Sequence, residues 1–128
     1  MVWTFEAYET DAGNRIVQEW YWEEICLDDR DLIRDRIRYL KNVGRHLWKE
    51  PYFESMGELG EIKKRSTPRG ALRIYGCFRE GAVFLFLHGV LKKARKDKKG
   101  INTSKLRLRK LQAEVGRSHE FEFKERST

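Results

Sequence analysis

The sequence predicts an α+β protein whose helices and strands lie in separate parts of the chain. Apolar residues recur at helical spacing from about residue 11 to residue 43, whereas strand-like alternation and apolar runs fill residues 58–91. The charge is just as uneven, because residues 1–62 carry 8 Lys and Arg against 14 Asp and Glu, and residues 63–117 carry 17 against 3. An acidic half followed by a basic half is expected of a protein that holds a polyanion on one face. Nucleic acid is therefore the first partner to consider.

The first half of the chain predicts one strand followed by two helices. Residues 2–8 alternate and are rich in aromatic side chains, as in a β-strand, and the helical spacing begins after the acidic turn that follows them. Asp28 is the expected N-cap of the second helix, and Gly44 is its expected stop. Residues 45–56 mix aromatic side chains with proline and predict a connection with one short helical turn.

The second half predicts an antiparallel meander of three strands, residues 58–65, 71–79 and 82–91. The separating segments, residues 66–70 and 80–81, both have the glycine, proline and polar residues of turns. The last of these strands is apolar on both faces, which is typical of a strand in the interior of a sheet.

The C-terminal part predicts a helix and a short tail. A charged loop, residues 92–100, leads to a helix for which Asn102 or Thr103 is the expected cap. We expect one domain over residues 1–117. The tail, residues 118–128, then forms either a late edge strand or an unpacked end.

Composition places the protein among single-domain cytoplasmic proteins. A chain of 128 residues can bury one compact core without disulfides or metals. Cys26 and Cys77 stand singly in apolar stretches, so we expect small core residues in a reducing compartment and no metal site. The first residues do not resemble a secretion signal, and the longest apolar run, residues 82–91, is too short to span a bilayer. We expect no cofactor and no membrane segment.

The two-residue period of a strand places several basic side chains on one face of the meander. The polar surface predicted in this way carries Lys63, Arg65, Arg73 and Tyr75, and is bordered by Lys92 and Lys93. On a nucleic-acid interface the cations would neutralise phosphates and Tyr75 would offer a ring on which a base can stack. The alternative is a solvated sheet face, and composition alone does not separate the two.

Other residues near this face are secondary candidates. Lys64, Arg69, Arg95 and Lys96 add positive charge and are expected to contact the RNA backbone. His88 is the histidine of the predicted inner strand, and imidazole is a common general acid or base near neutral pH. A single histidine in an apolar strand is more often a hydrogen-bonded core residue, so both interpretations stay open.

Two segments of the chain resemble a known family. The stretches GELGEIKKRSTPRGALRIYGCF and FLFLHGVLKKARK, together with the order of elements, resemble the RelE/HigB superfamily of toxins from type II toxin–antitoxin modules, in particular its phage-derived HigB-like branch. The resemblance covers residues 3–115, and its specific part is residues 57–96. It implies two N-terminal helices packed on a small, twisted, mainly antiparallel sheet, followed by a C-terminal helix.

The resemblance also implies an activity, which is ribosome-dependent cleavage of messenger RNA in the A site. The 2′-hydroxyl of the RNA would be the nucleophile, so the reaction requires no metal. The basic positions that match the family, and that would orient the scissile phosphate and stabilise its charge, are Lys63, Arg65, Arg73, Lys92 and Lys93. Parts of the family use a late tyrosine, but no tyrosine follows Tyr75 here, which leaves Tyr75, Lys63 or His88 as acid or base. Lys63 would serve as a base if Arg65 and Arg73 lowered its pKa.

The implied partner is a small helix-turn-helix antitoxin. It would cover the basic face, or dock elsewhere, for example on the acidic N-terminal helices, and block access to the ribosome. Two other functions remain open. The related ParE group shares the architecture and inhibits DNA gyrase, and a phage-related regulator would bind nucleic acid without cutting it.

Overall fold

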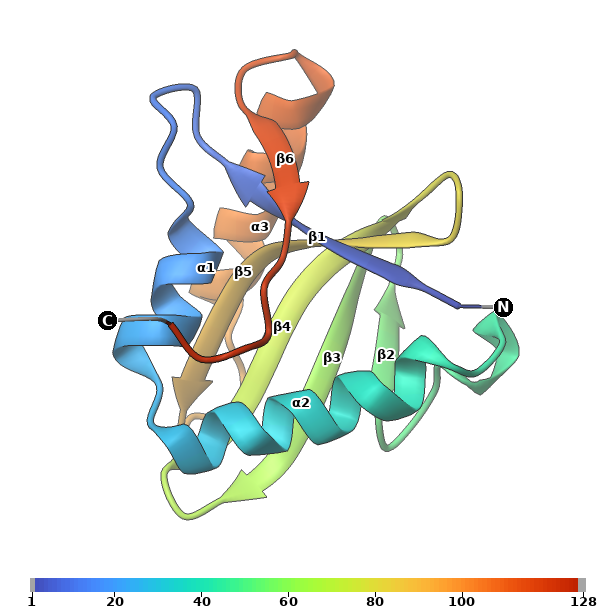
Figure 1. The fold of residues 1–128 in the computed structure, drawn as a ribbon, viewed down its shortest axis with the longest axis vertical. Coiled ribbons are helices and arrows are strands. Elements are labelled where there is room, and N and C mark those ends of the chain that lie inside the picture. The colour runs from blue at the N-terminus through green and yellow to red at the C-terminus, as the bar shows by residue number, and fades with distance from the viewer. Residues whose placement is uncertain (1, 127–128) are drawn as a thin grey trace.

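The structure, a computed structural model, describes residues 2–126 apart from the side chains of Arg65 and Ser66. A strongly curved sheet is crossed on one face by a long helix and covered on the other face by a second one (Figure 1). The elements in chain order are β1 (Thr4–Glu9), α1 (Ile16–Glu19), the π-helical turn η1 (Trp20–Glu24), α2 (Leu27–Lys41), the 3-10 turn η2 (Arg45–Leu47), β2 (Phe53–Met56), β3 (Leu59–Thr67), β4 (Gly70–Arg79), β5 (Val83–Lys92), α3 (Lys98–Gln112) and β6 (Arg117–Glu120).

The sheet is mixed. Within residues 2–126 it has six strands in the order β2-β3-β4-β5-β1-β6. The pair β1–β5 is parallel, with Thr4 opposite Val83, and the other neighbours are antiparallel. The predicted α+β class and the three-stranded meander are confirmed, and β5 lies in the interior of the sheet as expected.

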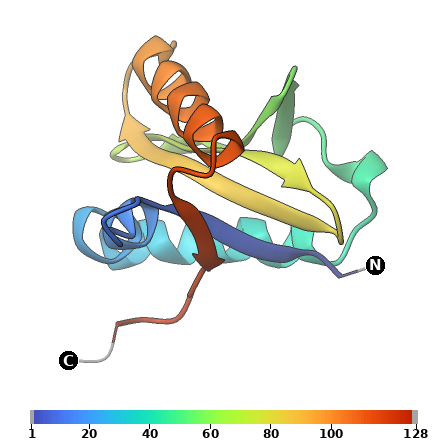
Figure 2. The same ribbon diagram turned by 90° about the horizontal axis from the view of Figure 1, so that it is seen from above.

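Helices lie on both faces of the sheet (Figure 2), and each face has its own hydrophobic core. On one face, α1, η1 and α2 cover an aromatic cluster in which Trp48 contacts Trp3, Phe53 and Phe84. On the opposite face, α3 covers a smaller core that includes Leu87. We call the first the α2 face and the second the α3 face. Successive residues of a strand point to opposite faces, so this division decides which predicted site residues can meet.

The N-terminal helices differ in detail from the prediction. The first is short, because α1 passes directly into the π-helical turn η1. Asp28 lies in the first turn of α2, and Cys26 occupies the N-cap position. Cys26 is exposed rather than buried, because it lies at the N-terminal end of α2, where its thiol donates to the Asp29 carboxylate at 3.4 Å. Cys77 is buried as predicted.

The connection before the meander contains more structure than predicted. Its short helical turn is η2, but Phe53 then begins β2, which pairs with β3 opposite Ile62. A four-residue strand gives too few alternations to be recognised in a sequence. It forms because Phe53, only 1% exposed, fills the aromatic core of the α2 face.

The C-terminal elements also begin earlier than predicted. Helix α3 starts at Lys98 with Asp97 as its N-cap, so the expected caps Asn102 and Thr103 lie inside the helix. The tail forms the edge strand that was one of the two alternatives, because β6 pairs with β1. Beyond β6, Phe121 is buried in the core of the α2 face. Residues 127 and 128 of the predicted tail lie outside the described residues.

Candidate nucleic-acid interface

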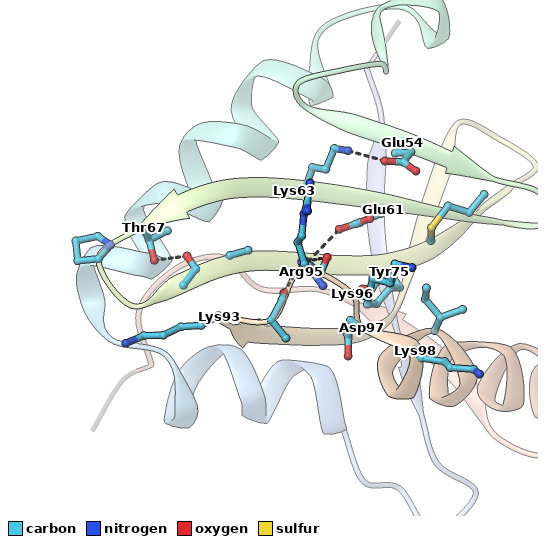
Figure 3. Close-up of a pocket in the computed structure, with 17 residues that line it drawn as sticks. Glu54, Glu61, Lys63, Thr67, Tyr75, Lys93, Arg95, Lys96, Asp97 and Lys98 are labelled. Atoms are coloured by element: carbon cyan, nitrogen blue, oxygen red, sulfur yellow. Dashed lines mark hydrogen bonds and ion pairs between the residues drawn. The ribbon is translucent and has the colours of Figure 1, made fainter.

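A charged cleft of about 900 Å³ opens on the α3 face (Figure 3). Strands β3 and β4 form its floor, and residues 93–98 together with the start of α3 form its rim. Cations outnumber carboxylates in its lining. The charged lining residues are Lys63, Arg73, Lys93, Arg95, Lys96 and Lys98, with Glu54, Glu61 and Asp97. The two-residue period correctly predicts that Lys63, Arg73 and Tyr75 share a face, and the chain reversal after β5 adds the rim.

Arg73 is held rigidly at the floor of the cleft. It lies opposite Lys63 on β3, and its Nη2 donates to the main-chain carbonyls of Ala94 and Arg95, both at 2.9 Å. Its Nε lies 3.6 Å from Oε2 of Glu61. The side chain is only 12% exposed, so its orientation is fixed before any ligand arrives. A preorganised guanidinium is a strong donor to phosphate.

Lys63 is buried at the floor with its charge already compensated. Its side chain is 3% exposed, and Nζ lies 2.5 Å from Oε1 of Glu50 and 2.7 Å from Oε1 of Glu54. Burial disfavours the charge, but the two carboxylates outweigh burial and raise the pKa of Lys63. The expectation that neighbouring cations would lower this pKa is wrong, because Glu50 and Glu54 come from outside the predicted face. Lys63 is an ammonium at neutral pH and has no free electron pair to act as a base.

The rim carries exposed cations. We call residues 93–96 the cationic loop, since Lys93, Arg95 and Lys96 are exposed and form no ion pair with the part of the chain that the structure describes. Lys98 continues this positive surface at the first turn of α3. In Figure 3, Lys93 and Lys98 extend toward opposite ends of the cleft. These side chains are available to a polyanion.

Three predicted RNA contacts lie outside the cleft. Lys64 points to the α2 face, where it lines a small pocket beside Arg36 of α2. The Arg69 guanidinium makes two bonds, of 2.6 and 2.9 Å, to the buried Asp29 carboxylate, which holds the turn before β4 against α2. Lys92 donates to Oδ1 of Asp97 at 2.8 Å. The last two cations already have carboxylate partners.

Tyr75 has the properties of a proton donor. It is 1% exposed, and burial, followed by the carboxylates of Glu61 and Asp97, raises its pKa above the ordinary value of 10.0. The phenol therefore stays protonated at neutral pH. This state suits donation to a phosphate oxygen and does not suit the role of a general base.

His88 is separated from the cleft although it is next to Tyr75. The two rings face each other across β4 and β5 with centroids 6.3 Å apart. His88 lines a different groove, between α1, the end of β5 and α3, where Arg107 Nη1 lies 3.4 Å from its Nδ1. Burial and then Arg107 lower the pKa of His88, so the imidazole is neutral at pH 7.

The described part of the tail, residues 118–126, supplies no late catalytic side chain to the cleft, because residues 121–124 run along the α2 face. Tyr21 of η1 donates to the carbonyl of Phe123 at 2.6 Å, and Gln18 of α1 donates to the carbonyl of Glu122 at 2.9 Å. Arg65 belongs to β3, but its side chain lies outside the described residues, so its predicted role stays a prediction.

The carboxylates of the cleft were missed as functional candidates. Glu61 shares the two-residue period of Lys63, so the pattern contained a signal for it. Asp97 immediately precedes a helix start, which is the usual signal for an N-cap. Among residues 2–126, no group of three or more His, Cys, Asp or Glu side chains is arranged to hold a metal ion.

Comparison with protein-family models and with curated proteins gives no match to this chain. None of the helices found in residues 2–126 is long and apolar enough to cross a membrane.

Proposed function

We propose that this protein is a RelE/HigB-like toxin of a type II toxin–antitoxin module and acts as a ribosome-dependent messenger-RNA endoribonuclease. The observation that carries the proposal is the combination of a fixed guanidinium, Arg73, with a rim of exposed cations above it. Exposed cations attract and hold an RNA backbone, and a rigid donor at the floor stabilises charge on one phosphate.

The chemistry requires a nucleophile, a base and an acid. The 2′-hydroxyl of the RNA attacks the adjacent phosphorus, and the bond to the 5′-oxygen breaks, leaving a 2′,3′-cyclic phosphate. Glu61, whose carboxylate lies beside Arg73 on the same floor, would take the proton of the 2′-hydroxyl. Tyr75, which stays protonated at neutral pH, would give a proton to the departing 5′-oxygen. Arg73 and Lys93 would neutralise the phosphate during the step.

The arrangement of elements supports the family assignment. Helical segments precede the meander and pack on one face of the sheet, and a third helix follows β5, in the order that the family resemblance implies. The sheet differs in carrying the parallel β1–β5 pair and the added edges β2 and β6. Strand β6 lies at the far edge of the sheet beside β1, whereas β2 borders the cleft and contributes Glu54 to its lining.

The proposed toxin would act on the ribosome and be inhibited by an antitoxin. The substrate would be messenger RNA in the ribosomal A site, and the protein would work in the cytoplasm with a helix-turn-helix antitoxin. The acidic residues of α2 offer little free charge to that antitoxin, since Asp31 and Asp35 pair with Arg34 and Arg38 of the same helix. The exposed cationic loop is the more favourable target for an acidic antitoxin segment.

The rival functions use the cleft differently. A ParE-like gyrase inhibitor has no need for a phosphate-aligning arginine at the floor of a cleft. A regulator that only binds nucleic acid would need the exposed loop, but would not need the buried set of Arg73, Tyr75 and Glu61. These rigid buried groups favour the cleaving enzyme.

The test is cleavage of messenger RNA on purified ribosomes, with 5′ ends mapped by primer extension. We expect new ends within the A-site codon with the wild type, and a loss of about 100- to 1000-fold in rate with Arg73→Ala, because one fixed donor to the charged phosphate is removed. Arg38→Ala is the matched control, since Arg38 is an exposed arginine on α2. Absence of new ends with the wild type would overturn the proposal, and gyrase supercoiling would be assayed next.

A further inference from the structure

Asp97 stands at the junction of the cationic loop and α3 with an unusually buried carboxylate. The side chain is 2% exposed. Its Oδ1 accepts from Lys92 Nζ at 2.8 Å and from the Gly100 amide at 3.2 Å. No described group forms a hydrogen bond with its Oδ2. A carboxylate inside a cationic cleft is costly to bury and reduces the attraction of that cleft for RNA. The presence of Asp97 here is therefore not explained by RNA binding.

Lys92 and Asp97 flank the cationic loop on its two sides. Lys92 is the last residue of β5 and Asp97 is the residue before α3, so their ion pair joins the two ends of residues 93–96. Between these ends, the carbonyls of Ala94 and Arg95 turn inward to Arg73. The loop is therefore fixed at both ends and in the middle, and its exposed cations are carried on an ordered backbone.

The Asp97 carboxylate packs closely against the first turn of α3. A Cβ atom added to Gly100 would lie 2.1 Å from Oδ2 of Asp97, so a side chain at residue 100 would displace the carboxylate. The same carboxylate acts electrostatically on Tyr75 in the floor of the cleft. Asp97 thus contacts the loop end and the helix start, and its charge also acts on the floor.

We infer that Asp97 is a positioning residue, which holds the cationic loop and Arg73 in the geometry that aligns the scissile phosphate, at the expense of RNA affinity. This inference rests on the proposed function. Replacing Asp97 should therefore change RNA binding and the rate of the chemical step in opposite directions. Removing the negative charge and releasing Lys92 should strengthen RNA binding by electrostatics alone, whereas loosening the loop should slow the chemical step.

The test compares Asp97→Asn with the wild type in ribosomal messenger-RNA cleavage under single-turnover and steady-state conditions. We expect kcat to fall about 10- to 100-fold, because small misplacements of aligning groups have effects of this size, while KM stays equal or decreases. Glu80→Gln is the matched control, since Glu80 is an exposed carboxylate in the turn between β4 and β5 and its loss changes the net charge equally. An unchanged kcat in a folded Asp97→Asn protein would overturn the inference.

A double-mutant cycle with Lys92→Met tests the route of the effect. If Asp97 acts through the ion pair that closes the loop, Lys92→Met also lowers kcat, and the two substitutions together cost far less than the product of their separate effects. Fully multiplicative effects would show that the ion pair does not carry the positioning.

A second readout does not depend on catalysis. Trypsin cuts a bond fastest where the surrounding backbone can leave its folded conformation, so the rate of cutting after Lys93 and Arg95 reports how firmly residues 93–96 are anchored. We expect the Asp97→Asn protein to be cut at least about tenfold faster there than the wild type and the Glu80→Gln control. Unchanged protection would overturn the inference even if the chain cleaves RNA. Faster cutting in a chain without ribonuclease activity would refute the proposed function and leave the anchoring role in place.

Discussion

The α2 face and the cationic loop use positive charge in opposite ways. On the α2 face three arginines are paired with carboxylates: Arg30 and Arg34 share Glu125, and Arg126 contacts Glu19 and Glu23. In the cationic loop, on the α3 face, Lys93, Arg95 and Lys96 form no ion pair with any described residue. Similar side chains thus hold the fold together in one place and remain available to a ligand in the other. The number of cations in a segment says little about binding until their partners are known.

The largest expected difference between the faces is in RNA affinity. Replacing Lys93, Arg95 and Lys96 by alanine removes the unpaired charge of the rim, so we expect binding to single-stranded RNA to weaken about 100-fold at low salt and the slope of log K against log salt to decrease by about 2. Fluorescence anisotropy over a salt series measures both. Alanine at Arg38, Lys41 and Lys49, three exposed cations near the α2 face, is the control with the same change in charge. Equal losses in the two triple variants would remove the distinction between the faces.

The ion pair between Asp29 and Arg69 should contribute to the stability of the fold rather than to RNA binding. The Asp29 side chain is fully buried and bound by Arg69, so we expect Asp29→Asn to lower the free energy of unfolding by about 2 kcal/mol, which is about 30-fold in the folding equilibrium. Arg69, and to a smaller extent the thiol of Cys26, hold the pKa of Asp29 below its ordinary value of 3.8 despite burial. The stabilisation is therefore fully present above that value and is lost as the pH falls through the lowered pKa of the folded state.

Urea unfolding of the wild type and Asp29→Asn at several pH values checks this prediction. The difference between the two proteins should be constant from neutral pH down to about pH 5 and should shrink below that. A difference that grows on acidification would contradict the assigned sign.

Within the α3 face, Tyr75 and His88 are neighbours with different expected roles. Tyr75→Phe removes the proposed proton donor, and we expect kcat to fall about tenfold or more, with a changed pH profile and an unchanged salt dependence of RNA binding. His88→Gln should change kcat less than twofold, because the imidazole lies in the other groove. The wild type and both variants would be compared in the same ribosomal assay. A larger loss with His88→Gln than with Tyr75→Phe would reverse these assignments.

The sequence predicted the meander and much of the floor of the cleft, because both follow from a two-residue period within single strands. It placed Lys63, Arg73 and Tyr75 on one face, and the structure brings them together. It did not predict that Glu50 and Glu54 neutralise Lys63, or that Asp29 holds Arg69. These carboxylates belong to other elements, and only tertiary packing brings them near.

The rim illustrates the same limit of local patterns. The cluster of lysines and arginines after β5 was evident, but its division into exposed cations and the closing Lys92–Asp97 pair depends on where α3 begins. The sequence pattern predicts that start at Asn102 or Thr103, more than one turn too late, which leaves Asp97 in the preceding loop. An N-cap whose carboxylate also forms an ion pair with the preceding strand is recognised only when both elements are in place.

The position of β1 has a consequence for how the chain folds during synthesis. The first strand lies between β5 and β6, with Thr4 opposite Val83 and Tyr8 opposite Ser118, so its partners are the strands made last. Contacts over such sequence separations slow folding, and on the order of 100 residues must be added after β1, which takes about 5 to 20 s at ordinary translation rates. The meander of β3, β4 and β5 leaves the ribosome before β6 and can form through local hairpins. A newly made chain therefore passes through a stage in which β1 can pair with β5 but its other edge has no partner strand.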